Sequence, residues 1–212
     1  MRENIITMGR KILLAFIALA IVLPLSGQAE NKKSALLVID IQYFYFPGGD
    51  MPLYQPEKAA KNAAMIIDKF RSDKNDVIYV KHNYEPGEGI HNSVKPLEGE
   101  KVFNKDNVNS FLDTGLNEYL QENNIDRLVI CGMQTHMCVE AAVRAAADLG
   151  YECILIHDAC TSRDLKFNDH IITAVDVHLS TLSTLRSYAK IISAEEYLIY
   201  YTHQKNHFPY HR

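Results

Sequence analysis

Cysteine is scarce in this sequence of 212 residues, and no region gathers charge of one sign. The four cysteines are too few for a disulfide scaffold, and none is spaced as a CxxC pair or a Cys/His zinc site. Lys and Arg number 22 against 26 Asp and Glu, a formal charge of -4, so we expect no nucleic-acid partner. With 47% hydrophobic residues, collagen-like, low-complexity and disordered classes are excluded as well.

The apolar run near the start of the chain is too short to cross a bilayer. It spans residues 12–25, about 14 positions where a transmembrane helix needs about 20, and it follows Arg10 and Lys11. Small residues then lead to Ala29, the layout of a secretory signal peptide. We expect residues 1–29 to be cleaved, leaving an exported protein, periplasmic or secreted, with no stable membrane span. A retained membrane anchor and a buried N-terminal helix are the alternatives.

After residue 30, apolar runs of strand length alternate with stretches of helical period, and no linker interrupts them. The strands are expected at 35–41, 77–80, 101–104, 128–131, 153–156 and 190–192. The helices are expected at 56–70, 111–121 and 139–149. This alternation predicts an α/β fold of three α/β/α layers, a doubly wound, mainly parallel, six-stranded and Rossmann-like sheet. We expect one domain over residues 30–212, with a short C-terminal extension from about residue 199.

Two reactive side chains stand at expected strand ends, where doubly wound sheets bind ligands. Asp40 interrupts the apolar segment LLVIDIQ, and a buried carboxylate needs a partner. Cys138 follows the strand at 128–131 and precedes a helical pattern, so it is expected at a helix N-terminus, which favours a thiolate. Each residue also has a plain structural interpretation, Asp40 as a loop-capping acid and Cys138 as a small core residue.

The combination of these residues with Lys105 resembles a known family. The segments ALLVIDIQ, EKVFNKDNVNSF, VICGMQTHMCVEAA and DACTSRD occur in this order on the alternating plan. In this respect the chain is similar to the isochorismatase-like cysteine hydrolase superfamily, on its amidase and streptothricin-hydrolase side. The resemblance covers residues 35–195 and implies the fold expected above.

The resemblance implies a catalytic triad of Asp40, Lys105 and Cys138. Cys138 is then the nucleophile, Lys105 supplies a cation that favours its thiolate, and Asp40 is the general base. It also implies a cis peptide bond between Met133 and Gln134, with the backbone N–H groups of Gln134 and Cys138 forming an oxyanion hole.

Two departures from the family concern the pocket. Nicotinamidases carry an Asp-x-His metal motif where this chain has His82, Asn83 and Tyr84, so we expect no metal and no cofactor. A metal held by His82 and His91 stays an alternative. Tyr43 and Phe44 follow Gln42 where many relatives have Asn-Asp, which gives the pocket mouth a more aromatic character.

The residues expected to line the substrate pocket are Gln42, Tyr43, His82 and His136. The sequence thus predicts a cysteine hydrolase that cleaves an amide or lactam C–N bond of a small molecule through a thioester on Cys138. Isochorismatase-type vinyl-ether hydrolysis and a non-catalytic small-molecule-binding protein are the alternatives. We also expect a homo-oligomer, and a disulfide between Cys153 and Cys160 stays open.

Overall fold

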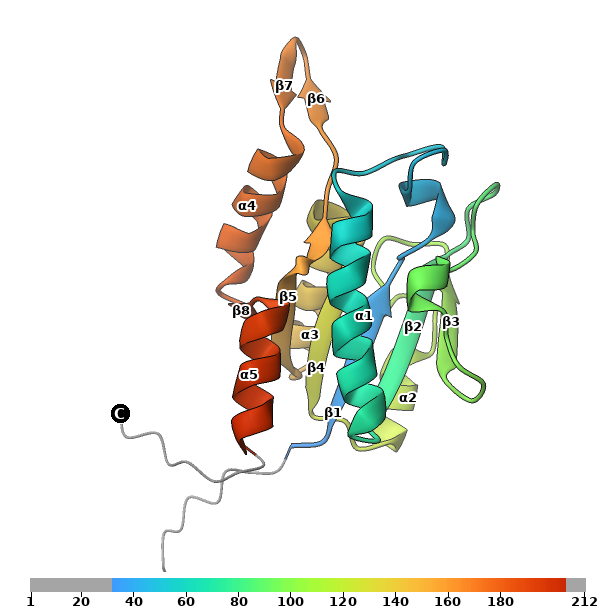
Figure 1. Cartoon of the computed structure of the whole chain (residues 1–212), viewed down its shortest axis with the longest axis vertical. Coiled ribbons are helices and arrows are strands. Elements are labelled where there is room, and N and C mark those ends of the chain that lie inside the picture. The colour runs from blue at the N-terminus through green and yellow to red at the C-terminus, as the bar shows by residue number, and fades with distance from the viewer. Residues whose placement is uncertain (1–31, 205–212) are drawn as a thin grey trace, which may run out of the picture. The chain divides into compact units, whose positions relative to one another are not determined.

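The computed structural model describes residues 32–204, and its centre is a sheet of six parallel strands. The strand order is β3-β2-β1-β4-β5-β8 (Figure 1). The strands are β1 (Ser34–Ile39), β2 (Asp76–His82), β3 (Lys101–Lys105), β4 (Arg127–Met133), β5 (Glu152–Thr161) and β8 (Lys190–Ile192). The middle strands are apolar along their length because helices cover both of their faces. The predicted fold class is confirmed.

Two sets of helices form the outer layers. On one face lie α1 (Pro56–Ser72) and α5 (Ala194–Gln204), and on the other lie α2 (Leu116–Glu122), α3 (Glu140–Asp148) and α4 (Ala174–Leu185). Figure 1 shows α1 and α5 on the near side of the sheet. Successive residues of β1 alternate between the two cores, as the two-residue period of a strand requires.

The strand expected at 153–156 extends to Thr161. Two other expected boundaries were wrong, and a positive φ explains each. The first strand ends at Ile39 because Asp40, with φ 49°, turns the chain out of the extended conformation. The helix expected at 111–121 begins only at Leu116, because Gly115 before it has φ 74°. A left-handed residue cannot continue either element.

Several elements were not predicted from the sequence. After β5 the chain forms a hairpin of β6 (Leu165–Phe167) and β7 (His170–Ile172) and then α4. The N-terminus of α4 carries a recognisable signal, since the Thr173 hydroxyl accepts a hydrogen bond from the N–H of Asp176. Short 3-10 turns occur at Tyr43–Tyr45 (η1) and Asn92–Val94 (η2).

The two ends of the chain bear on other expectations. The signal peptide expected at 1–29 lies outside the described residues, as do residues 205–212 of the extension. The extension expected from about residue 199 is described as far as Gln204, as the second half of α5. In the part of the chain that the structure describes, no helix has the length and apolarity of a membrane span.

The order of the strands determines where the site forms. β2 and β3 lie on one side of β1, and β4 and β5 lie on the other, so the chain reverses its direction of winding next to β1. The loops after β1, β3 and β4 therefore meet at the carboxyl end of the sheet, where such folds bind ligands.

Candidate active site

The side chain of Lys105 is the centre of the site. It ends β3 and is closed to solvent. Its Nζ lies 2.8 Å from Asp40 Oδ2, and it donates hydrogen bonds to Cys138 Sγ at 3.2 Å and to His82 Nδ1 at 3.0 Å. An ammonium has three N–H donors, so each has an acceptor here. The fold thus joins Asp40, Lys105 and Cys138, which the sequence analysis combined, and adds His82.

Asp40 is held in place by the backbones of two neighbouring strands. Its side chain is fully buried, and its N–H donates to the carbonyl of Val80 at 2.9 Å. On the other side, Gly132 lies so close to β1 that a Cβ there would come within 2.0 Å of the Ile39 oxygen. Glycine at position 132 therefore lets β4 approach the end of β1, next to the carboxylate.

Cys138 lies in a π turn at Thr135–Val139 (η3), directly before α3. The final N–H of the turn donates to the carbonyl of Gln134 at 3.3 Å. A hydrogen bond of 2.8 Å between the Thr135 hydroxyl and Nδ1 of His178 ties the turn to α4. Cys138 was expected at the N-terminus of the helix itself. The wider turn places it two residues before Glu140, the first residue of α3, with its sulfur facing Lys105.

The resting thiol differs from the sequence-based expectation. Burial and, to a smaller extent, Asp40 raise the pKa of Cys138 to about 12, and Lys105 only partly opposes this. The net direction is opposite to the lowering of the thiol pKa expected from a helix N-terminus, because desolvation outweighs one nearby cation. Burial also raises the pKa of Asp40 against the opposing effect of Lys105. Burial and Lys105 lower the pKa of His82, which keeps its ring neutral as an acceptor.

The same cluster bears on metal binding. Among the described residues, ligand atoms of Asp40, His82 and Cys138 lie within 4.8 Å of one another, a spacing that could hold an ion. Lys105 Nζ contacts all three groups, so an ammonium already takes the central cation position. A metal would have to displace a buried lysine, so the residues present do not fit one. His91, the other half of the alternative pair, is not in this group.

Gln134 lies beside the nucleophile turn and is itself held by side chains. The peptide bond between Met133 and Gln134 is cis. The Gln134 side chain donates to Met51 Sδ at 3.2 Å and accepts from Arg163 Nε at 3.2 Å. Tyr45 also hydrogen-bonds to Gln134, and burial raises the pKa of its hydroxyl. The side chain of Gln134 is therefore fully engaged, which fixes the backbone next to Cys138.

Gln42 and Tyr43, both expected in the pocket, have different surroundings. Gln42 is fully buried; its Nε2 donates to the carbonyls of His82 and Glu88 at 2.9 and 2.6 Å, and its Oε1 accepts from the His82 N–H at 2.8 Å. Its amide holds the loop after β2. Tyr43 is 39% exposed and lines an open cavity with His91.

His136 points toward β5. Its Nδ1 shares a hydrogen bond of 3.1 Å with the Ser162 hydroxyl, and burial and the nearby Arg163 lower its pKa. The ring is thus neutral and takes part in fixing the turn.

The remaining cysteines form no bridge. All four cysteines are free and buried, so the bond considered between Cys153 and Cys160 is not formed. Burial raises the pKa of Cys153 and of Cys160 to about 12, and raises that of Cys131 well above its usual value.

Two residues near the site were missed by sequence analysis. Tyr45 belongs to the aromatic run after Gln42, where alternation with Tyr43 was the available signal. His178 had no signal, because its helix was not predicted and its contact with Thr135 spans 43 positions of the chain.

Comparison with known proteins agrees with this geometry. The model of the isochorismatase domain matches residues 34–187. The uncharacterized isochorismatase family protein YddQ of Bacillus subtilis (strain 168) is 44% identical over 177 residues, 78% of this chain and 98% of that protein. A streptothricin hydrolase of Streptomyces noursei is 28% identical over 163 residues, 69% of this chain and 56% of that enzyme.

A crystal structure supports the same relationship. The structure of an isochorismatase from Pseudomonas putida KT2440 has a TM-score of 0.73 and 32% identity, covering 77% of this chain and 89% of that one. The family model covers most of the described residues, including the ends of β1, β3 and β4 that carry the site. The chain belongs to the isochorismatase family of hydrolases.

Proposed function

We propose that the protein is a cysteine hydrolase that cleaves the C–N bond of an amide or lactam in a small molecule, through a thioester on Cys138. The observation that carries this proposal is the ammonium of Lys105, which contacts both a buried thiol and a buried carboxylate. The similarity to streptothricin hydrolase, at 28% identity, supports the bond class.

The first step moves a proton from the thiol to the carboxylate. A thiol with a pKa of about 12 is protonated at neutral pH, so a base must accept its proton as sulfur attacks. Asp40 lies beside it, and its raised pKa makes it a stronger base than an exposed aspartate. Lys105 stays positively charged and stabilises the thiolate as it forms.

The following steps return the proton and release the products. A C–S bond forms as sulfur attacks the carbonyl, and the tetrahedral oxyanion accepts from the backbone N–H groups of Gln134 and Cys138. The C–N bond then breaks, and protonated Asp40 gives its proton to the leaving nitrogen. Water next attacks the thioester with Asp40 as base, and the carboxylic acid leaves as Cys138 regains its proton.

The test is turnover of a panel of carboxamides, ureido acids, lactam antibiotics and isochorismate, followed by mass spectrometry. We expect one amide or lactam to gain water in the wild type and not in Cys138→Ala, with Cys153→Ala as the matched control. A short quench should trap the acyl group on Cys138. Equal turnover by wild type and Cys138→Ala would exclude the thioester.

Vinyl-ether hydrolysis is the second candidate, and the raised pKa of Asp40 favours it. Because burial raises its pKa, this carboxyl takes up a proton more readily than an exposed aspartate and can pass that proton to an enol ether without a thiol. In that case Asp40→Asn abolishes turnover of isochorismate while Cys138→Ala retains it. A non-catalytic binding protein would turn over no panel member in either form.

We also propose that the protein is exported. The basic residues, short apolar run and small residues that lead to Ala29 support cleavage after that residue. The intact mass of the protein recovered from the periplasm or the medium should match a chain that begins at Glu30. Recovery of the full-length chain in the membrane fraction would contradict this.

Assembly as a homo-oligomer is proposed from one apolar surface. Phe167 and Ile171 on the hairpin are 71% and 70% exposed, and Leu179 on α4 is 57% exposed. Large apolar side chains that remain exposed on neighbouring elements of the chain support an association surface there. Light scattering should give a multiple of the chain mass, which the double variant Phe167→Ser/Ile171→Ser lowers. A monomer at every concentration would contradict it.

A further inference from the structure

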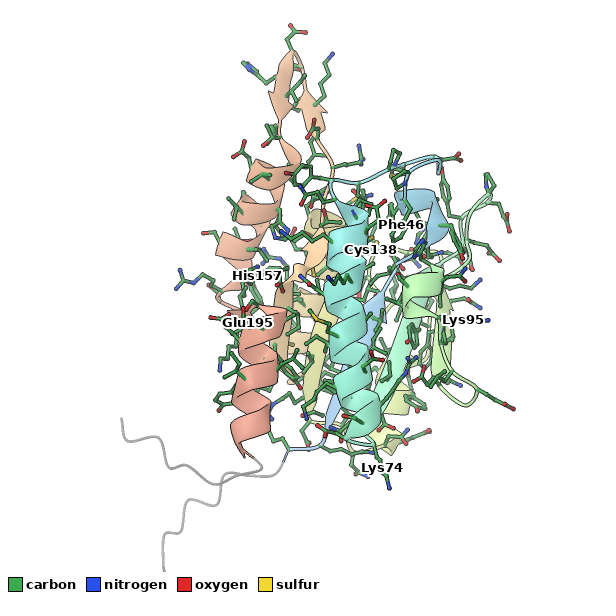
Figure 2. The ribbon with its side chains drawn as sticks, in the orientation of Figure 1. Phe46, Lys74, Lys95, Cys138, His157 and Glu195 are labelled. Carbon is green, nitrogen blue, oxygen red and sulfur yellow. The ribbon has the colours of Figure 1, made fainter. Side chains whose placement is uncertain are left out.

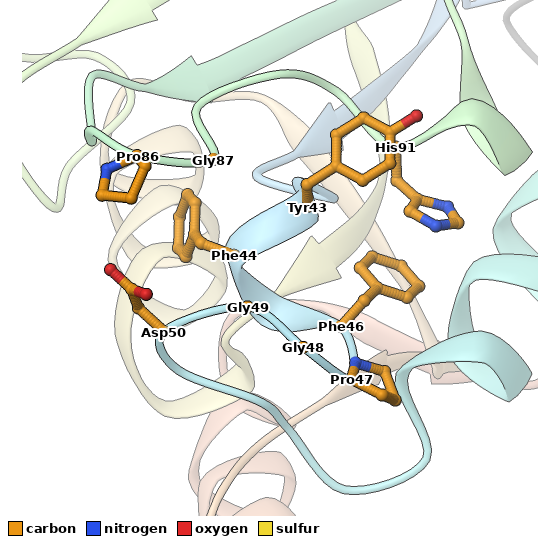
Figure 3. A pocket seen from close by; sticks show the side chains of 10 residues that line it. All are labelled: Tyr43, Phe44, Phe46, Pro47, Gly48, Gly49, Asp50, Pro86, Gly87 and His91. Carbon is orange, nitrogen blue, oxygen red and sulfur yellow. The ribbon is translucent and has the colours of Figure 1, made fainter.

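An open cavity of about 460 Å³ lies on the loops that follow β1 and β2. It is lined by Tyr43, Phe44, Phe46, Pro47, Gly48, Gly49, Asp50, Pro86, Gly87 and His91 (Figure 3). None of the residues bonded to Lys105 lines it. Its size is in the range of small-molecule sites.

The aromatic walls of this cavity are built before any ligand arrives. Phe46 stacks on His91 with ring centroids 3.7 Å apart, and Tyr43 lies 4.9 Å from the same ring. Across the cavity in Figure 3, Phe44 lies next to Pro86. A Cβ at Gly49 would come within 2.6 Å of the Phe44 backbone, so the loop closes on this wall only with glycine. The rings are therefore positioned by the fold.

The charge on the side chains that line the cavity is negative. Asp50 is its sole acidic side chain, no lysine or arginine lines it, and no salt bridge of Asp50 occurs among residues 32–204. Burial lowers the pKa of His91, so its ring is neutral near pH 7, and the charge of Glu57 acts on that ring as well. Aromatic faces and a carboxylate both attract cations.

The segment of the chain that lines the cavity also supports the catalytic centre. Its residues 43–50 follow Asp40 closely, and Tyr45 and Met51 in the same segment bind the side chain of Gln134. Figure 2 places Phe46 and Cys138 in the same part of the molecule, with Lys74 at the opposite end. One segment thus supplies both the cavity wall and the support for the backbone beside Cys138.

We propose that this cavity binds a positively charged group of the substrate, an alkylammonium or another organic cation, against the exposed ring of Tyr43, with Asp50 as its counter-charge. The proposal rests on the proposed function and specifies its substrate class: an amide or lactam that carries a cationic group apart from the bond that breaks. Neither charge nor bond changes in this binding step.

Three probes of similar size test the proposal by titration calorimetry on the purified protein: the cation phenyltrimethylammonium, the uncharged 2-phenyl-2-propanol and the anion benzenesulfonate. We expect the cation to bind at least about fivefold more tightly than the others, the selectivity of a moderate cation–π and ionic contact. Asp50→Asn should weaken the cation about fivefold and leave the uncharged probe unchanged. Tyr43→Ala should weaken the cation about threefold.

Asp148→Asn removes one exposed charge from the end of α3 and is the matched control, which should bind all three probes like the wild type. Equal binding of the three probes, or cation binding that Asp50→Asn does not change, would overturn the proposal. The proposed function is judged separately by Cys138→Ala, which abolishes turnover but should bind phenyltrimethylammonium like the wild type. Failure of one proposal is therefore distinguishable from failure of the other.

Discussion

Cys138 and Cys160 are alike in burial and in pKa, and they differ in what surrounds them. Burial raises the pKa of each thiol to about 12. The Cys160 thiol donates to a carbonyl of its own strand, that of Ile156, at 3.4 Å. Cys138 faces the cation of Lys105 and the carboxylate of Asp40. A raised pKa therefore does not distinguish a core thiol from a reactive one, and the neighbouring groups decide.

The backbone around the two thiols differs in the same sense. Cys160 lies inside β5, where it pairs with Gly132 of β4 across the sheet. Cys138 lies in the turn beyond the end of β4, where side chains from β3 and the β1 loop reach it. A residue inside a strand has its neighbours in the adjacent strands and in the helix layer that covers the sheet, while one at the carboxyl end meets several loops.

The largest expected effect tests this comparison directly. Cys138→Ala should lower turnover by about 10⁴-fold or more, because no other group can form the thioester. Cys160→Ala should keep turnover within about twofold, since its thiol contacts only backbone. Initial rates of the two purified variants measure both. A comparable loss in both variants would contradict the distinction drawn between the two thiols.

Removing the two partners of Cys138 should sharpen the comparison. Asp40→Asn and Lys105→Met should each lower turnover by about 10³-fold, since one removes the base and the other the stabilising cation. The rate at which iodoacetamide alkylates Cys138 at pH 8 should change in opposite directions in the two variants. Asp40 raises the pKa of Cys138 and Lys105 lowers it, so alkylation becomes faster in Asp40→Asn and slower in Lys105→Met.

The double variant Asp40→Asn/Lys105→Met is the control for this pair. It removes both buried charges, so neither is left unpaired, and its alkylation rate should lie between those of the single variants. Circular dichroism checks that each protein is folded. Equal alkylation rates in all four proteins would show that these charges do not act on Cys138.

The turn that carries Cys138 also depends on α4, unlike the strand that carries Cys160. Burial, aided by His157, lowers the pKa of His178 to about 4. The unfolded chain takes up this proton near pH 6.5, so stability should fall as the pH drops from 6.5 to about 4, by about 2 kcal/mol for this residue. His178→Gln should flatten that part of the curve, measured by urea unfolding at several pH values. The exposed His170→Gln should follow the wild type, and an unchanged slope in His178→Gln would count against this role.

The smallest expected effect concerns the third acceptor of Lys105. His82→Ala leaves one N–H of the ammonium without its acceptor, which should lower kcat about tenfold. His82→Asn restores an acceptor near the position of Nδ1 and should recover most of the rate. Steady-state kinetics of the two variants test whether His82 acts by positioning the ammonium of Lys105 or only by filling space. If the lost side-chain volume alone mattered, both variants would have the same rate.

The sheet and most of its helices could be predicted because their signals are local. The apolar runs that became β1, β4 and β5 and the helical period that became α1 are visible in short windows of sequence. The helix α4 was missed although it buries Val177, Leu182 and Leu185. The hairpin was missed because residues 165–172 form two short strands whose side chains are mostly exposed. Such an element has no buried face to impose a pattern.

The sequence by itself determined the fold class, since strands that alternate with helices imply parallel crossovers, and the family resemblance combined the three residues that the structure brings together. Only the tertiary structure decided that Lys105 contacts His82 as well as Asp40 and Cys138, that burial raises the pKa of the Cys138 thiol, and that aromatic residues line an open cavity with one acid. The physical reason is that pKa values and cavity shape depend on desolvation and contacts between residues far apart in the chain, which no local pattern encodes.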